Sequence, residues 1–220
     1  MAQMHCNFFS YSLGYPVDIE VTLPSFTSCN LHLPHTHALP GKFPVLYLLH
    51  GHGNDYQAWL RYTSAERYAE EYRMAVVTFS CHNKAYQNAP LGENFYDFLN
   101  EELPEFVENY FPVSDKSEER YIAGLSMGGY GALLHGLTNP GKYRAIGAFS
   151  PGIPAENADP DLNRIARFNL FDVTRKALAS GEKLPDLFMC IGDGDFLYER
   201  VTSYRKAFLD GWTASRCRYD

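Results

Sequence analysis

From residue 44 onward, short apolar segments alternate with segments of helical pattern, and this alternation limits the fold more than any other feature. The strand-like segments span residues 44–49, 74–79, 121–123, 145–149, 186–191 and 215–219. The helix-like segments between them span 64–72, 95–110, 130–137, 173–179 and 198–209. Strands that alternate with helices predict a mostly parallel sheet with helices on both faces.

Residues 4–23 follow a different pattern, because apolar and polar side chains alternate with a period of two on both sides of Gly14. This period predicts two antiparallel strands, which brings the expected sheet to eight strands. We therefore expect a single α/β domain over residues 1–220. The segment 152–167, rich in Pro, Asp and Asn, breaks the rhythm. It is either a pocket-shaping insertion or an ordinary long connection.

Charge and hydropathy exclude several classes of partner. The chain has 19 Lys and Arg against 26 Asp and Glu, a formal net charge of −7, and its basic residues do not cluster. This argues against binding to nucleic acid or to an anionic membrane surface. The longest apolar run is Val45–Leu49, too short to span a bilayer, and the N-terminus lacks a secretory signal pattern. We expect a cytoplasmic protein.

The metal-ligating residue types give no convincing site. The five cysteines are an odd number without a C-x-x-C pair, which favours reduced thiols over disulfides or zinc ligands. His32, His35 and His37 lie close together, but prolines interrupt the segment, so we interpret it as a loop that binds no metal. We expect neither a metal nor an organic cofactor.

The most informative motif is Gly124-Leu-Ser126-Met-Gly128, which follows one expected strand and precedes one expected helix. A G-x-S-x-G sequence in this setting is typical of a nucleophile elbow, a tight turn that exposes the serine hydroxyl. Glycine is needed on both sides, because a Cβ there would collide with the neighbouring strand and helix. Ser126 is therefore the candidate nucleophile.

A nucleophile of this kind needs backbone N–H donors for the oxyanion that forms on the attacked carbonyl. Met127, directly after the serine, offers one. The segment His50-Gly-His52-Gly53 follows the third strand, where a second donor is expected, so His52 would act through its N–H. The alternative is that the imidazole of His50 or His52 is the catalytic base or a metal ligand.

Two carboxylates, Asp193 and Asp195, follow the strand-like segment 186–191, and either could orient an imidazole. We favour Asp195, because the apolar residues 196–198 that follow it would partly shield it from water. No histidine follows the acid, although the expected order is Ser, acid, His. His82, after the fourth strand, is the possible substitute base, whereas His135 lies within a helix and is expected to be structural.

Together these residues resemble the esterases of the esterase D and tributyrin esterase type, in the α/β-hydrolase superfamily. The resemblance covers nearly the whole chain. It is carried by the segments 48–54, 94–96, 101–104, 123–132 and 192–198, together with Trp59. It implies the α/β-hydrolase fold, with Ser126 as nucleophile, Asp195 as acid, and His52 and Met127 as oxyanion donors.

The resemblance also implies a reaction: hydrolysis of short-chain acyl esters through an acyl-enzyme, with acetyl, butyryl or hydroxycinnamoyl esters of sugars as substrates. Phe95 and Tyr96 are either acyl-pocket residues or ordinary core aromatics. Family members carry a His-Xaa-Trp segment after the last strand, followed by a helix. Since segment 216–219 resembles the strand before it, we expect the chain to be truncated at its C-terminal end. The other classes left open are an inactive or non-enzymatic scaffold and a thioesterase or peptidase.

Overall fold

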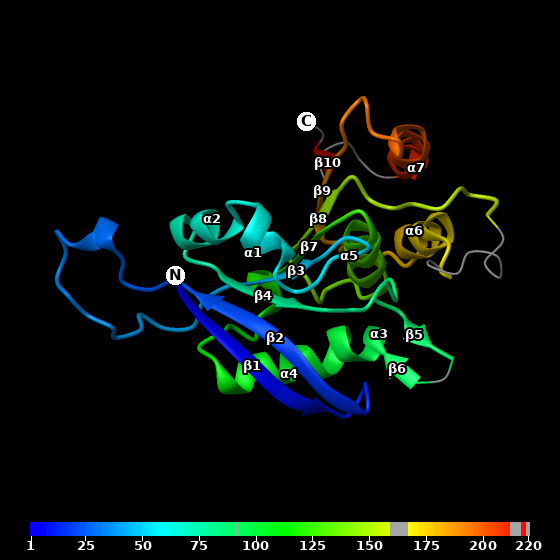
Figure 1. Ribbon diagram of the computed structural model, residues 1–220. Coiled ribbons are helices and arrows are strands. Elements are labelled where there is room, and N and C mark those ends of the chain that lie inside the picture. The colour runs from blue at the N-terminus through cyan, green and yellow to red at the C-terminus, as the bar shows by residue number, and fades with distance from the viewer. Residues whose placement is uncertain (91, 159–166, 212–216, 219–220) are drawn as a thin grey trace.

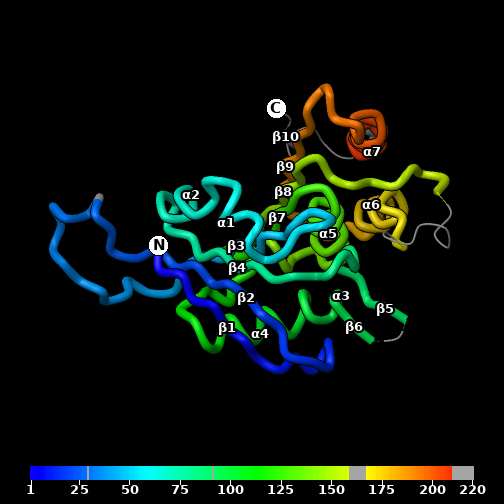
Figure 2. Tube along the Cα trace, in the orientation of Figure 1, coloured from blue at the N-terminus to red at the C-terminus, as the bar shows by residue number. Residues whose placement is uncertain are grey.

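The computed structural model describes residues 1–90, 92–158, 167–211 and 217–218 (Figures 1 and 2). Its strands are β1 (Ala2–Ser10), β2 (Tyr15–Leu23), β3 (Val45–Leu49), β4 (Ala75–Phe79), β5 (Asn88–Ala89), β6 (Gly92–Asn94), β7 (Arg120–Leu125), β8 (Ala145–Phe149), β9 (Asp186–Cys190) and β10 (Cys217–Arg218). Its α-helices are α1 (Ala58–Tyr62), α2 (Ala65–Glu71), α3 (Phe95–Asp97), α4 (Leu103–Tyr110), α5 (Met127–Thr138), α6 (Leu170–Ala179) and α7 (Tyr198–Gly211).

Among the described residues, eight strands form one sheet in the order β1-β2-β4-β3-β7-β8-β9-β10. β1 pairs with β2, and β2 with β4, in antiparallel fashion, while the pairs from β4 to β10 are parallel. The predicted mixed, mostly parallel α/β sheet is confirmed. Of the expected last strand over 215–219, only residues 217 and 218 lie within the described part of the chain.

The two faces of the sheet carry cores of unequal size. Alternate residues of β3 (Val45, Tyr47 and Leu49) point into a large core that takes in buried side chains of α4, α5, α6 and α7. Leu48 points the other way, into a small core that includes Ala69 of α2. Figure 1 shows α1 and α2 on one side of the sheet and α4 on the other. Helices therefore cover both faces, as the alternation predicts.

The expected helix over residues 95–110 is a composite. Its middle turn, Phe98–Glu102, is π-helical and joins α3 to α4. Glu102 is 3 % exposed and accepts hydrogen bonds from Ser10 Oγ (2.7 Å) and from the N–H groups of Tyr11 and Ser12 (2.8 and 2.9 Å). This carboxylate therefore fastens the β1–β2 turn to the helix. The sequence pattern did not indicate this π-helical turn, helix α1 or the β5–β6 hairpin.

None of the helices within the described residues combines the length and the apolar character needed to cross a bilayer. Cys6 and Cys81 are free thiols, as the cysteine pattern predicts. Residues 159–166, half of the segment interpreted as an insertion or a long connection, lie outside the described part of the chain. In the described start of that segment, Gly152 N donates a hydrogen bond to Ser126 O, in the predicted nucleophile (2.8 Å).

Candidate active site

Ser126 lies in the sharp turn between β7 and α5. Its φ and ψ angles are 55° and −112°, in a region that residues with a Cβ rarely adopt. The turn is held by its backbone. The N–H of Ser126 donates to Phe149 O (2.9 Å), and its carbonyl accepts from Gly152 N (2.8 Å) and from Tyr130 N (3.0 Å). A strained residue that its surroundings hold this firmly is typical of a functional position.

The glycines of the motif are required by close backbone contacts. A Cβ on Gly124 would lie 2.3 Å from the carbonyl carbon of Gly128, and one on Gly128 would lie 2.3 Å from Leu49 O. One on Gly131 would lie 2.5 Å from the ring of Tyr86. The absence of these side chains lets β3, β7 and α5 come together around Ser126. The predicted reason for the G-x-S-x-G spacing, a collision of any Cβ with strand and helix, is the one that the structure shows.

The loop after β3 passes beside the nucleophile, since a Cβ built on Gly51 would lie 3.7 Å from Ser126 Cβ. Asn54 N donates to Gly51 O (3.2 Å), which closes a β-turn with His52 and Gly53 at its centre. Gly53, the third residue of this turn, has a φ of +77°, which glycine adopts without steric cost. Met127 is the first residue of α5, so its N–H has no acceptor within the helix. Of the two predicted oxyanion donors, Met127 thus follows Ser126 directly, and His52 lies in the loop that passes beside it.

His50 is 1 % exposed, and backbone groups occupy both of its ring nitrogens. Nδ1 bonds to Gly51 O (2.8 Å), and Nε2 accepts from Cys81 N (3.0 Å). Burial lowers the pKa of this imidazole. Neither nitrogen is left for a proton transfer or a metal ion, which removes the basis for interpreting His50 as a base. His52, by contrast, is exposed.

The loop after β4 contains His82, the possible substitute base. His82, Asn83, Ala85 and Tyr86 all have positive φ, an unusual run of left-handed residues. The His82 ring is exposed and lies 6.3 Å, centroid to centroid, from that of Phe95. The position at the carboxyl end of β4 fits the proposed role. Among the described residues, however, Ser126 Oγ makes no hydrogen bond to any histidine.

The two aromatic residues at the start of the composite helix differ in their surroundings. Phe95 is fully buried and packs near Phe79 and Phe98, as an ordinary core aromatic does. Tyr96 is half-buried, stacks on His135 with 4.6 Å between ring centroids, and shares a 2.7 Å hydrogen bond with Thr138 Oγ1. The geometry therefore favours the core interpretation for Phe95.

His135 is structural, as its helical position predicts. It is fully buried in α5, and its Nε2–H donates to Tyr86 O over 2.8 Å. Burial lowers its pKa to about 4, so the ring is neutral near pH 7. Sequence reasoning missed Tyr86, whose hydroxyl donates to His50 O (2.8 Å), because nothing in the motif around it indicates a role beside the nucleophile.

The predicted acid lies in an open turn between β9 and α7. Asp195 is half-buried and Oδ1 accepts from Leu197 N over 2.8 Å, whereas Asp193 is exposed. Phe196 is 91 % exposed, so it does not give the expected shielding, whereas Leu197 is buried. Within the described residues, no hydrogen bond connects Asp195 to Ser126 or to an imidazole.

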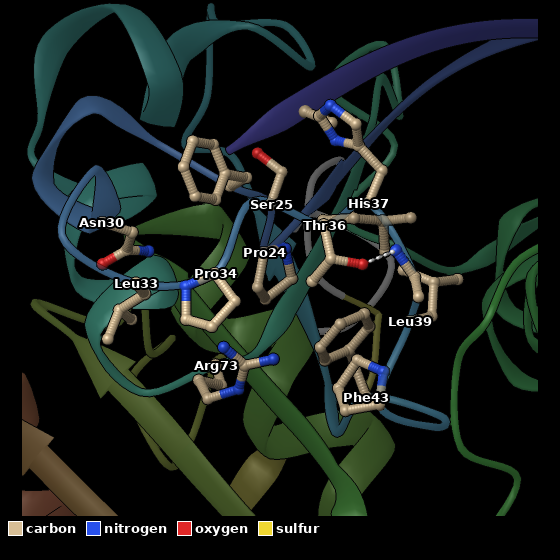
Figure 3. A pocket seen from close by; sticks show the side chains of 15 residues that line it. Pro24, Ser25, Asn30, Leu33, Pro34, Thr36, His37, Leu39, Phe43 and Arg73 are labelled. Carbon is tan, nitrogen blue, oxygen red and sulfur yellow. Dashed lines mark hydrogen bonds between the residues drawn. The ribbon is translucent and has the colours of Figure 1, made fainter.

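A separate cavity of about 320 Å³ lies at the other edge of the sheet. Figure 3 shows its lining, with Arg73 and Phe43 on one side and the projecting loop that bears Leu33 and His37 around it. Phe43 and Arg73 precede β3 and β4, so the cavity is at the amino ends of parallel strands, whereas Ser126 is at the carboxyl ends. In the part of the chain that the structure describes, no three potential metal ligands converge.

The sheet order, the strained serine turn and the glycine contacts define a protein of the α/β-hydrolase fold. Residues 22–171 match the family described as "Putative esterase". Because the match covers more than half of the chain, the protein belongs to this esterase family, whose activity is ester hydrolysis. The matched segment includes Ser126 and His52 and ends before Asp195.

Individual proteins agree with this membership. An acetyl esterase of Caldicellulosiruptor saccharolyticus is 29% identical, over 90% of this chain and 83% of its own. The Staphylococcus aureus fluorophosphonate-binding serine hydrolase FphF, solved with substrate bound, superposes with a TM-score of 0.85 and 28% identity. The S-formylglutathione hydrolase FrmB of the same species gives 0.83 and 27%. The match covers all of this chain and 89% of each of those two.

Proposed function

We propose that the protein is a serine esterase that hydrolyses carboxylic esters with short acyl groups through an acyl-enzyme. The observation that carries the proposal is the geometry of Ser126. The residue is held in a strained turn at the start of α5, beside the loop His50–Gly53. Such a turn exposes a hydroxyl where backbone N–H groups can meet the attacked carbonyl.

In this reaction Ser126 Oγ attacks the ester carbonyl and gives its proton to a general base. The N–H groups of Met127 and His52 donate to the oxyanion. The intermediate then collapses, the ester C–O bond breaks, and the alcohol leaves with that proton. Water attacks the acyl-enzyme in the same way and releases the carboxylic acid. These steps use side-chain and backbone groups and water, and the proposal includes no cofactor.

The general base in this proposal is a histidine that Asp195 orients. From the family resemblance, we expect that histidine to follow the last strand. His82 is the alternative among the described residues, because it lies at the carboxyl edge of the sheet with an exposed ring. The two versions differ in one variant: His82→Gln abolishes activity only if His82 is the base.

The proposed substrates are acetyl, butyryl or hydroxycinnamoyl esters of small molecules, and the proposed place of action is the cytoplasm. The acetyl esterase relative supports a short acyl group. The similarity to an S-formylglutathione hydrolase supports a thioester as a second substrate class. Initial rates with p-nitrophenyl acetate, butyrate and octanoate and with an acyl thioester would rank these groups.

The decisive experiment is labelling with a fluorophosphonate probe, compared between the wild-type protein and Ser126→Ala. We expect covalent labelling of the wild type alone, and loss of p-nitrophenyl acetate hydrolysis by on the order of 10⁵-fold or more in the variant. Equal labelling and equal hydrolysis in the two proteins would reject the serine esterase and leave the non-enzymatic scaffold.

A further inference from the structure

The loop that carries His52 is connected to the loop after β4 by hydrogen bonds on both sides of His52. On one side, His50 Nε2 accepts from Cys81 N (3.0 Å) and His50 O accepts from the Tyr86 hydroxyl (2.8 Å). On the other side, Gly53 N donates to Asn83 Oδ1 (2.7 Å). One loop, residues 81–86, therefore fixes the position of the other from both ends.

The His50 ring requires a single protonation state to make these bonds. Because Cys81 N is a donor, Nε2 must be an unprotonated acceptor. Because Gly51 O is an acceptor, Nδ1 must carry the proton. A positively charged ring would place two N–H groups opposite each other at Cys81. The contacts thus select one neutral tautomer, which burial of the ring also favours.

These bonds leave the N–H of His52 unused. Gly51 O is taken by Asn54 N and the His50 ring, and the N–H of Gly53 by Asn83. Among the described residues, His52 N donates to no acceptor, and the residue is exposed. An N–H group that is held in place and unpaired next to a nucleophile is what an oxyanion donor requires.

The supporting loop is itself anchored to the helix of the nucleophile. The Tyr86 ring fills the space left by Gly131 of α5, and Tyr86 O accepts from His135 Nε2 of the same helix. Its left-handed residues, including Asn83, have unfavourable backbone angles that persist only where surrounding contacts impose them. The helix after Ser126 and the loop that bears His52 are therefore connected through residues 81–86.

We propose that His50 is a positioning residue, whose neutral ring holds the His52 N–H at the oxyanion position by tying its loop to Cys81. The inference rests on the proposed function, since it assigns how that site is held in shape. Asn83 and Tyr86 share the task through their own bonds to the loop. In this proposal His50 acts only through backbone groups, by the bonds of its ring to Gly51 O and Cys81 N.

A pair of variants separates this role from simple core packing. His50→Gln can place its amide oxygen near the former Nε2 position and accept from Cys81 N, whereas His50→Asn is too short to do so. With p-nitrophenyl acetate we expect His50→Asn to lower kcat on the order of 10- to 100-fold, with KM within about twofold. We expect His50→Gln to recover most of that loss. A folded His50→Asn protein with wild-type kcat would overturn the proposal.

Asn83→Gly serves if the buried variants do not fold. Asn83 is exposed and left-handed, which suits glycine, so the change removes little except the bond to Gly53. We expect kcat to fall roughly 3- to 10-fold, as for a partial loss of one oxyanion donor. Asn109→Ala, a change to an exposed α4 side chain, is the control and should leave kcat unchanged. Equal kcat in the two variants would contradict the proposal.

Two measurements decide the proposal without any catalysis. Nitrogen NMR of the imidazoles should show His50 protonated at Nδ1 and bare at Nε2 near pH 7, and the opposite tautomer would overturn the assignment. Amide hydrogen exchange at Gly53 should accelerate at least about tenfold in His50→Asn, and unchanged exchange would also overturn it. If the wild type hydrolyses esters no faster than Ser126→Ala, the proposed function fails, while these two measurements still test the role of His50.

Discussion

The two turns that carry the predicted nucleophile and acid are built differently. The Ser126 turn is closely surrounded by backbone, because β8 and α5 hydrogen-bond to Ser126 and the end of β3 lies against Gly128. The Asp195 turn is open: a Cβ on Gly192 or Gly194 would meet nothing within 4 Å, and Phe196 is largely in solvent. The first turn is held by backbone bonds to Phe149 and Gly152, which lie outside its motif. The second is closed only by bonds among its own residues, from Asp195 N to Gly192 O, from Tyr198 N to Asp195 O and from Leu197 N to the Asp195 carboxylate.

This difference has a chemical basis. A nucleophile needs its hydroxyl exposed at one fixed position, with N–H donors to the oxyanion beside it. A few adjacent residues can therefore determine most of its geometry. An orienting acid acts through an imidazole, so its position is useful only relative to that partner. The first turn should therefore tolerate almost no change in the backbone, and the second should tolerate backbone change but not loss of its carboxylate.

Among the changes that compare the two turns, the largest expected effect is that of removing the acid. Asp195→Asn should lower kcat for p-nitrophenyl acetate by about 10⁴-fold, because the amide cannot hold the base in the required tautomer. Asp193→Asn, two residues away and exposed, is the matched control and should stay within about twofold. Steady-state kinetics of the two variants checks this. A larger loss in Asp193→Asn would transfer the role of acid to that residue.

The next effect compares one added methyl group in the two turns. Gly128→Ala puts a Cβ 2.3 Å from Leu49 O, and we expect a loss of about 3 kcal/mol or more in the free energy of unfolding. Gly194→Ala, with nothing within 4 Å, should change it by less than about 0.5 kcal/mol. Urea unfolding measures both. Similar losses in the two variants would show that the enclosed and open turns do not differ in packing.

The smallest expected effect is a pH dependence of stability on the nucleophile side. The pKa of His135 is lowered to about 4 in the folded protein, against about 6.5 in an unfolded chain. Between these values the unfolded state binds the extra proton. The neutral ring's contribution is therefore intact above about pH 6.5 and is lost as the pH falls towards 4, by up to about 3 kcal/mol.

Urea unfolding at pH 7, 5.5 and 4 in the wild type and in His135→Gln measures this contribution. The variant can still donate to Tyr86 O but does not titrate, so its stability should fall less steeply over this interval. If the two proteins lose stability in parallel, other groups cause the acid sensitivity.

Several features could be predicted from the sequence because they are local. The alternation of segments predicts the sheet and its direction, and Gly124, Ser126 and Gly128 predict the elbow with its physical reason. The other features depend on partners far along the chain. The Glu102 anchor needs residues 10–12, and burial of Phe95 needs Phe79. No periodicity of a single segment contains such information.

By itself, the sequence determined the α/β class, the strand-turn-helix around Ser126 and the set of candidate residues, because backbone sterics act between neighbours. The tertiary structure decided what the histidines do. Nothing in the sequence around His50 or His135 shows that the ring is buried. In the folded protein, each ring is buried and hydrogen-bonded to a backbone group distant along the chain. A side chain's protonation and hydrogen-bond partners are properties of its surroundings, and only folding assembles those.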